Sequence, residues 1–213
     1  MHYSSLMSGL SFAEIYGSID KIVIDIGGSN VNGSLRDFFT NLGMTYICVD
    51  LEAHPSVDIV VKPGEKLPFE TGSIDLIIST SCFEHDPCFW LTFKEMTRLV
   101  KLGGFIYINA PSNGVYHAYP GDNWRFYFDA GQALAYWSGL QVATEVVYPV
   151  KVVETFHIFI DTTEWIDFVC VWKRVEDKET NITISAEIET KIGVLEKRIN
   201  EKGLKTIKKS INR

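Results

Sequence analysis

A chain of 213 residues with 46% hydrophobic and 13% aromatic residues is long and apolar enough to bury a sizeable core, which excludes a disordered chain. The formal net charge is −7, and residues 1–173 hold about 20 acidic against about 10 basic residues. A nucleic-acid backbone is therefore not an expected partner, because phosphate binding needs a basic surface. The chain shows no transmembrane segment, no signal peptide and no disulfide framework among its four cysteines, so we expect a cytoplasmic location.

The first predicted strand, residues 22–26, ends in a turn rich in glycine. The strand is a short β-branched run that contains one acid, Asp25, and helical spacing restarts over residues 34–40. The turn between them holds Gly27, Gly28, Asn30 and Gly33. Glycine at such a crossover lets the backbone approach a ligand, and the following helix offers free N–H groups. A plain tight turn between a strand and a helix is the alternative interpretation.

Strands and helices alternate along the rest of the main region. Further strands are predicted over residues 45–50, 57–61, 74–80 and 104–109, with a helix over 89–100. A helix over 129–137 and two strands over 141–150 and 165–172 follow. This order predicts an α/β fold with a Rossmann-like, seven-stranded, mostly parallel sheet and helices on both faces.

The last forty residues change character. Isoleucine and leucine recur at steps of mostly three and four from Ile184 to Ile211, interrupted near Gly203. The spacing predicts an amphipathic helical extension over residues 174–213, after a main domain over residues 1–173. Two interpretations stay open: the helix packs on the domain or on a second copy, or its basic end contacts acidic lipid or a partner.

The second strand ends in Asp50, about two dozen residues after Gly27. Ligands of open parallel sheets bind at the carboxyl ends of the strands, and an acid at this place can accept two hydrogen bonds from a ribose diol. The loop from Gly27 to Gly33 lacks the GxGxxG spacing of dinucleotide binders, which disfavours a nicotinamide oxidoreductase. The alternative for Asp50 is a solvated acid at a strand end.

Five motifs follow one another along residues 20–173: VIDIGGSNVNGSLR, YICVDLEAHPSVDIVV, LPFETGSIDLIISTSCFEHD, EMTRLVKLGGFIYINAPS and YPGDNWRFYFDAG. In this order they resemble the class I S-adenosylmethionine-dependent methyltransferases. The VNGS turn and the YPxDxWRF segment resemble a subgroup associated with polysaccharide and surface-glycan assembly in bacteria and large viruses. The resemblance implies S-adenosyl-L-methionine as cofactor and a glycan or sugar as acceptor.

The resemblance also implies positions for the cofactor. The turn that contains Gly27, Gly28, Asn30 and Gly33 would lie against the methionine part, with Asp25 near its amino group. Asp50 would bind the ribose hydroxyls and Leu51 would stack beneath adenine. Thr80 and Ser81 would line the methionyl side. Similar proteins often carry an aspartate just before the segment that matches Leu67, and here Glu65 or a backbone carbonyl would meet the adenine amine instead.

A hydroxyl acceptor must be aligned with the methyl group and must lose its proton as the bond forms. The catalytic candidates are His85, after the fourth strand, and His117, after the fifth. His85 is preferred as the base because its connection to the strand is shorter, although it could instead orient Asp86 or cap the next helix. No metal is expected: Cys82, His85 and Cys88 lack a fourth zinc ligand, and magnesium at Glu84, His85 and Asp86 is a minor alternative.

The predicted acceptor site is the aromatic loop that contains Tyr119, Asp122, Trp124 and Arg125. Aromatic faces pack on a pyranose while Asp and Arg bind its hydroxyls. Alternatively, Trp124 anchors the loop and Arg125 pairs with Asp122. The predicted function is O-methylation of a sugar hydroxyl in a glycan. A methyltransferase for a small molecule or lipid intermediate, and an inactive cofactor-binding module that recruits partners through the C-terminal helix, are the alternatives.

Overall fold

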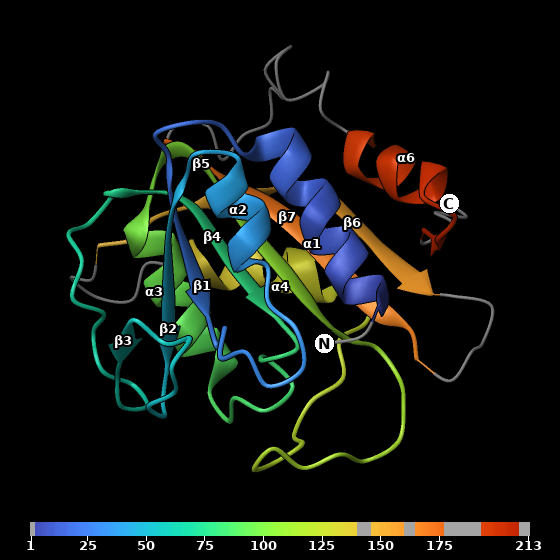
Figure 1. Cartoon of the computed structure of the whole chain (residues 1–213), viewed down its shortest axis with the longest axis horizontal. Coiled ribbons are helices and arrows are strands. Elements are labelled where there is room, and N and C mark those ends of the chain that lie inside the picture. Colours follow the sequence, from blue (N-terminus) through green and yellow to red (C-terminus); the bar gives the residue numbers. More distant parts are fainter. Residues whose placement is uncertain (1–2, 140–145, 160–164, 177–192, 209–213) are drawn as a thin grey trace.

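The structure is a computed structural model that describes residues 3–139, 146–159, 165–176 and 193–208. Its centre is one sheet with the strand order β3-β2-β1-β4-β5-β7-β6-β8 (Figure 1). The strands β1 (Ile22–Ile26), β2 (Thr45–Asp50), β3 (Ile59–Val60), β4 (Ile74–Thr80) and β5 (Val100–Pro111) run parallel. Strand β7 (Asp167–Arg174) is antiparallel to both β5 and β6 (Val150–Phe159). The predicted α/β fold with a mostly parallel sheet is confirmed.

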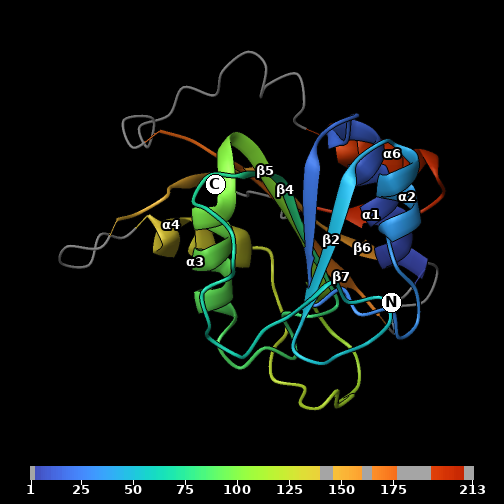
Figure 2. The ribbon, with the colours of Figure 1, turned by 60° about the vertical axis from the view of Figure 1, so that its left-hand side comes forward.

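Helices cover both faces of this sheet, as Figure 2 shows edge-on. Helices α1 (Tyr3–Tyr16), α2 (Arg36–Asn41) and α6 (Val194–Glu201) lie on one face, and α3 (Phe89–Leu99) and α4 (Ala130–Ser138) lie on the other. Neighbouring strand residues alternate between the two cores because successive side chains point to opposite faces: Val23 packs with Phe12 and Phe39, whereas Ile24 packs with Phe93. Burial of both sheet faces explains the nearly continuous apolar strands.

Helix α1 is an element for which the sequence pattern gives no prediction. Its buried side carries serines, so it lacks the apolar stripe of an amphipathic helix. Ser4 and Ser5 each donate a hydrogen bond to Asp167 Oδ2, at 2.7 and 3.1 Å, and Ser8 Oγ accepts one from Tyr107 at 2.8 Å. Polar partners inside the core therefore satisfy a polar helix face.

The strand predicted over residues 141–150 is wrong in position. Residues 140–145 lie outside the described residues, residues 146–149 are not in a strand, and β6 begins at Val150. Glu154 and His157 interrupt the apolar pattern of β6, although both are buried. Glu154 accepts hydrogen bonds from the backbone N–H groups of Leu195 and Glu196, at the start of α6, which explains a buried acid in a strand.

The predicted C-terminal helix is wrong beyond Gly203. That glycine has φ +84°, and the chain then forms β8 (Lys205–Ile207), antiparallel to β6, which adds an eighth strand to the predicted seven. Leu195 and Ile199 of α6 are fully buried in the same core as Phe12. Of the interpretations left open by the sequence, packing on the domain therefore describes α6. Residues 177–192 and 209–213, which hold the rest of the predicted stripe, lie outside the described residues.

The carboxyl ends of β1, β2, β4 and β5 meet at the lower edge of the molecule in Figure 1. The loops over residues 27–35, 51–58, 81–88 and 112–129 gather there. No described helix is both long and apolar enough to cross a membrane.

Candidate active site

The glycine turn after β1 packs directly on the ends of the neighbouring strands. Gly27 has φ +72° and its N–H donates a hydrogen bond to Val49 O at 2.9 Å. A Cβ at Gly27 would lie 2.2 Å from Cys82 Sγ, and one at Gly28 would lie 2.5 Å from Asp25 Cγ. A side chain at either position would push the turn off the sheet, so the glycines are needed for this close approach.

Asp25 supports the turn from below. Its side chain is 1% exposed and accepts a hydrogen bond from the Tyr46 hydroxyl, while Oδ1 has no hydrogen-bond partner among the described residues. Burial raises the pKa of Asp25 to about 7. The carboxyl lies beneath Gly28, and its expected place near a methionine amino group stays a prediction.

Asp50 joins the glycine turn to the end of β2. Its Oδ2 accepts the Ser29 N–H at 3.0 Å and its Oδ1 accepts the Leu51 N–H at 2.7 Å. Each carboxylate oxygen has two lone pairs, so each keeps one acceptor position for a ligand. The side chain of Leu51 is 54% exposed and offers an apolar surface beside this carboxylate.

Asn30 and Gly33 close the turn. Asn30 Oδ1 accepts the Gly33 N–H at 3.0 Å, and Gly33 has φ +128°. The side chain of Asn30 thus shapes the loop by a local hydrogen bond. Glu65 makes its described contacts within its own turn, where Oε2 accepts the Lys62 N–H at 3.2 Å and Oε1 lies 3.8 Å from Lys62 Nζ.

The end of β4 lies beside the turn. Thr80 is buried, and Ser81 has φ +49° with its N–H bonded to Asn109 O at 2.9 Å. A residue other than glycine in this left-handed region is a mark of a constrained site. Ser79, to which the sequence analysis gives no role, donates its hydroxyl to Ile26 O at 2.8 Å and so fixes β4 against the residue before Gly27.

Three side chains converge beyond β4 and β5. Glu84 Oε1 lies 3.6 Å from His85 Nε2 and 4.0 Å from His117 Nε2. The two imidazole rings meet edge to face, with their centroids 4.9 Å apart. Both predicted catalytic histidines therefore lie in one cluster, which we call the Glu84 cluster: Glu84, His85 and His117.

The other ring nitrogens of the cluster are held by acceptors. His85 Nδ1 lies 2.5 Å from Gly121 O, and His117 Nδ1 lies 3.2 Å from Asp122 Oδ2. A carbonyl oxygen only accepts, so we assign the hydrogen of His85 to Nδ1, which leaves a lone pair on Nε2. Burial lowers the pKa of His85, which favours this neutral form.

Glu84 is the residue of the cluster that the sequence analysis missed as a catalytic candidate. Its side chain is 1% exposed, and Oε2 has no hydrogen-bond partner among the described residues. Burial raises the pKa of Glu84 to about 8, and the charge of Asp167 adds to this effect. The Glu84 carbonyl accepts the N–H groups of Asn123 and Trp124, so the loop over residues 112–129 is fixed to it. The sequence gives Glu84 only as a ligand in the minor magnesium alternative, together with His85 and Asp86.

Some polar side chains of the predicted acceptor loop already form hydrogen bonds within the protein. Arg125 binds both oxygens of Asp122, at 2.5 and 2.7 Å, and this hydrogen bonding holds the pKa of Asp122 well below its usual range. Trp124 donates Nε1–H to Asp86 O at 2.9 Å. These contacts agree with the alternative interpretation, in which Arg125 pairs with Asp122 and Trp124 anchors the loop. Tyr119 is 62% exposed on the same loop.

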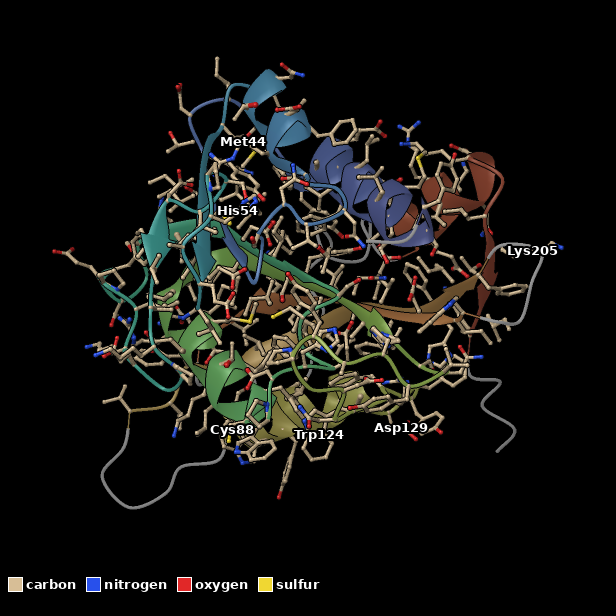
Figure 3. All side chains as sticks on the ribbon, turned by 60° about the horizontal axis from the view of Figure 1, so that its bottom comes forward. Met44, His54, Cys88, Trp124, Asp129 and Lys205 are labelled. Carbon is tan, nitrogen blue, oxygen red and sulfur yellow. The ribbon has the colours of Figure 1, made fainter. Side chains whose placement is uncertain are left out.

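A cavity of about 300 Å³ opens in this loop, near Trp124 at the lower edge of Figure 3. It is lined by Gly114, Tyr116, Asp122, Asn123, Trp124 and Arg125.

The two metal sets considered from the sequence are not the sets that the fold assembles. Cys82 Sγ packs against Gly27, and Cys88 is exposed. Asp86 accepts the Cys88 N–H at 2.8 Å and the Thr92 hydroxyl at 2.5 Å, so it holds the start of α3.

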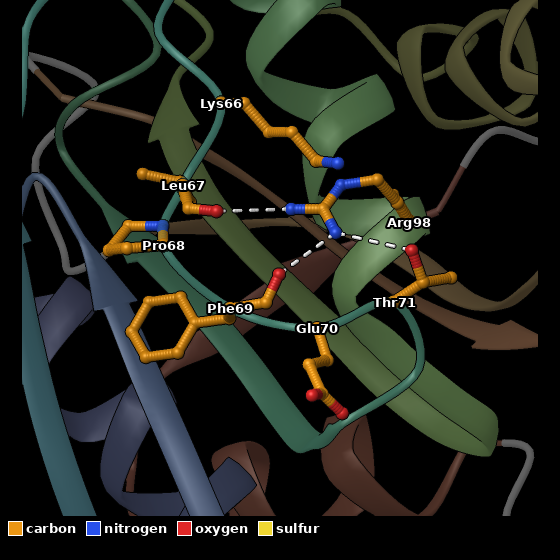
Figure 4. A pocket seen from close by; sticks show the side chains of 7 residues that line it. All are labelled: Lys66, Leu67, Pro68, Phe69, Glu70, Thr71 and Arg98. Carbon is orange, nitrogen blue, oxygen red and sulfur yellow. Dashed lines mark hydrogen bonds between the residues drawn. The ribbon is translucent and has the colours of Figure 1, made fainter.

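A larger cavity of about 570 Å³ lies away from these loops, at residues 66–71 (Figure 4). Arg98, near the end of α3, donates hydrogen bonds there to Leu67 O, Phe69 O and the Thr71 hydroxyl. The end of α3 adjoins the start of β4, because Arg98 O accepts the Gly72 N–H at 2.9 Å. This cavity therefore lies toward the amino ends of the parallel strands, away from the glycine turn. Arg98 holds the loop over residues 66–71 there by hydrogen bonds.

Comparison with known proteins shows similarity to methyltransferases over part of the chain. Residues 24–108 match the model of the methyltransferase domain family. An uncharacterized methyltransferase of Mycobacterium sp. (strain KMS) is 33% identical over 93 residues, which are 39% of this chain and 36% of that protein. One of Mycobacterium leprae (strain TN) is 28% identical over 102 residues, 43% and 37% of the two chains. The match thus spans little more than a third of the curated relatives.

Solved structures agree on the fold. The 1,6-didemethyltoxoflavin-N1-methyltransferase of Burkholderia thailandensis, solved with S-adenosylhomocysteine, has a TM-score of 0.62 at 14% identity and covers 82% of this chain and 79% of that one. The [4+2]-cyclase SpnF has a TM-score of 0.60 at 9% identity and covers 80% of each chain. Residues 24–108 thus match the methyltransferase domain family, and the chain has the class I methyltransferase α/β fold.

Proposed function

We propose that the protein is an S-adenosylmethionine-dependent methyltransferase. The observation that carries this proposal is the junction of the glycine turn with Asp50, where Ser29 N–H binds the Asp50 carboxylate at the carboxyl ends of β1 and β2. The family match over residues 24–108 includes both strands. The toxoflavin enzyme supports it further, because that protein of the same fold holds S-adenosylhomocysteine.

The residues at this edge fit the cofactor. The close approach of Gly27 and Gly28 to the sheet leaves backbone, not side chains, to meet the methionine part, with Thr80 and Ser81 at its side. Asp50 keeps two acceptor positions for a ribose diol, and Leu51 offers an apolar surface for adenine. When bound, S-adenosylmethionine supplies a methyl group on a positively charged sulfur, which passes to a nucleophile and leaves a neutral thioether.

We propose a hydroxyl oxygen as the nucleophile and the Glu84 cluster as the place where its proton leaves. As the new C–O bond forms, the hydroxyl gives its proton to the lone pair of an imidazole Nε2. Such a placed base contributes about 10² to 10⁴ in rate. The tautomer of His85, fixed by Gly121 O, supports this role. His85 stays our preferred base over His117, whose ring is more exposed.

A sugar hydroxyl of a glycan is the acceptor that we propose. The cavity beside Trp124 and Tyr116 combines aromatic rings with the polar groups of Asn123 and Arg125, which suits one pyranose ring. Its volume of about 300 Å³ equally favours a small-molecule acceptor, which is the second candidate.

Calorimetry with S-adenosylmethionine, S-adenosylhomocysteine and NAD tests the cofactor. We expect binding of the first two and no binding of NAD, and the absence of binding by either of the first two would refute the proposal. Transfer of a labelled methyl group to glycan fractions and to small polyols then tests the acceptor. Cofactor binding with no transfer to either class would favour the inactive binding module.

Transfer rates of His85→Ala and His117→Ala separate the two histidines. If His85 is the base, its variant loses about 10² to 10⁴ in turnover while S-adenosylhomocysteine binding is unchanged. Loss of turnover only in the His117 variant would reverse the two roles.

A further inference from the structure

We propose that the Glu84 cluster binds a zinc ion. Glu84 and His85 follow β4, and His117 lies on the loop after β5, so the fold brings the three together from two segments. Their possible ligand atoms all lie within 4.8 Å of one another. The binding of zinc stands on this geometry alone, whereas its consequence for catalysis rests on the proposed methyl transfer.

The distances are close to those of a zinc site. Glu84 Oε1 is 3.6 Å from His85 Nε2 and 4.0 Å from His117 Nε2. Bonds of about 2.0–2.1 Å in a tetrahedron place ligand atoms about 3.3 Å apart. Shifts of less than 1 Å would bring these two separations to that value. The third separation, between the two imidazole nitrogens, is at most 4.8 Å and would have to shorten by up to about 1.5 Å, which rotations of both side chains can supply.

The hydrogen bonds behind the cluster are those that metal-binding imidazoles make. His85 Nδ1 forms a hydrogen bond with Gly121 O. His117 Nδ1 forms one with Val115 O at 3.4 Å and lies 3.2 Å from the Asp122 carboxylate, which Arg125 holds in turn. Such partners fix each ring in the tautomer whose Nε2 lone pair is free for a metal. Both lone pairs are thereby presented on the side of Glu84.

The Glu84 carboxyl supplies an independent observation. It is 1% exposed, and its Oε2 has no hydrogen-bond partner among the described residues. A buried carboxylate needs a cation or a donor, and the nearby Arg125 is already bound to Asp122 through both of its terminal nitrogens. A divalent ion bound by Oε1 between Glu84 and the two histidines would compensate the buried charge, and bidentate coordination would also give Oε2 a partner.

The donor set favours zinc over magnesium or calcium. Two imidazole nitrogens and one carboxylate suit zinc, whereas the hard cations prefer oxygen ligands throughout. Three protein ligands leave a position open for an acceptor hydroxyl. A hydroxyl bound to zinc at that position would have a lowered pKa, so its proton would leave to solvent and its oxygen would attack the methyl group while the methyl–sulfur bond breaks and the sulfur leaves as a thioether. In this state the histidines act as ligands and not as the base.

Isothermal titration calorimetry of the metal-stripped protein with zinc chloride tests the proposal. We expect one equivalent of zinc to bind. The affinity should fall at least about tenfold in Glu84→Gln, His85→Ala and His117→Ala, because even the loss of a residue that only hydrogen-bonds to a metal ligand commonly lowers metal affinity about 10- to 100-fold. Cobalt(II) should give the visible absorption of a tetrahedral site in the wild type and not in the three cluster variants. His54→Ala and Cys88→Ser, which change an exposed histidine and an exposed thiol, should bind zinc as the wild type does.

Several outcomes would overturn the proposal. These are a wild type that binds no stoichiometric zinc, unchanged affinity in all three cluster variants, and loss of binding in Cys88→Ser. Circular dichroism of each variant shows whether it is folded. Calorimetry with S-adenosylhomocysteine on the metal-free protein keeps the two proposals apart: zinc binding without cofactor binding would support the metal site and refute the proposed function, and the reverse would leave the proton to an imidazole.

Discussion

Replacing Asp50 by alanine should weaken S-adenosylhomocysteine binding about 100-fold. The carboxylate already accepts one backbone N–H on each oxygen, from Ser29 and Leu51, and has one acceptor position per oxygen left for the two ribose hydroxyls. A hydrogen bond to a charged group contributes about 1.5–3 kcal/mol, so two would contribute about 3–6 kcal/mol. Asp50 is only half-buried, which favours the lower end. About 3 kcal/mol corresponds to about 100-fold in affinity.

Calorimetry on the wild type, Asp50→Ala, Asp50→Asn and Glu52→Ala measures this effect. Asp50→Asn keeps one acceptor oxygen and should fall between the wild type and the alanine variant. Glu52 is exposed two residues further along, so its variant serves as the control of equal loss of charge. A dissociation constant within about twofold of the wild type in a folded Asp50→Ala protein would refute the assignment, since such a difference corresponds to only about 0.4 kcal/mol.

Three further expectations follow from described contacts. Gly28→Ala would place a Cβ 2.5 Å from Asp25 Cγ and should weaken S-adenosylhomocysteine binding at least about tenfold. The control Gly139→Ala, whose Cβ would have its nearest neighbour at 3.7 Å, should bind as the wild type does. Equal affinities of the two variants would contradict the role of the turn. Burial lowers the pKa of His157 to about 4, so the folded chain leaves it neutral while the unfolded chain protonates it below about pH 6.5. Lowering the pH from 7 to 4.5 should therefore remove about 2–3 kcal/mol of unfolding free energy that His157→Gln does not lose, as urea unfolding would show; the same loss in both proteins would contradict this. Arg125→Met leaves the buried Asp122 carboxylate without its bidentate partner and should cost about 3 kcal/mol by urea unfolding, most of which the double variant with Asp122→Asn recovers; equal stability of the single and double variants would disprove the pairing.

The strands of the parallel half could be predicted from the sequence because both faces of that half are buried. Residues 22–26, 45–50 and 74–80 are apolar runs with few polar positions, and the structure has strands over the same residues. The glycine turn and Asp50 follow two of these strands directly. Their meeting could be inferred because parallel neighbours bring their carboxyl ends to one edge of the sheet.

Helices α3 and α4 and strand β7 were also predicted close to their bounds, whereas α1 and the position of β6 were not, because polar side chains are buried there. The serines of α1 and the pair Glu154 and His157 of β6 read as exposed positions, yet partners distant in sequence satisfy Ser4, Ser5 and Glu154. The convergence of His85 and His117 on Glu84 could not be predicted for a related reason. Thirty-one residues separate His85 from His117, and hydrogen bonds between residues 121–124 and residues 84–86 bring that loop back. Local sequence patterns do not predict contacts between segments that are distant in the sequence.

The packing of α6 against α1 has a consequence for how the chain folds. Phe12 and Ile199 share one core, and Lys202 Nζ binds Glu14 Oε1 at 3.0 Å across a sequence separation of 188 residues. Contacts of such separation raise the contact order and slow folding, because a long loop must close before they form. On the ribosome, α1 emerges early but waits for residues 194–204 before its core is complete. The face covered by α3 and α4 is built from segments closer in sequence, so we expect it to condense first and the α1–α6 face to consolidate only once residues 194–204 have been synthesised.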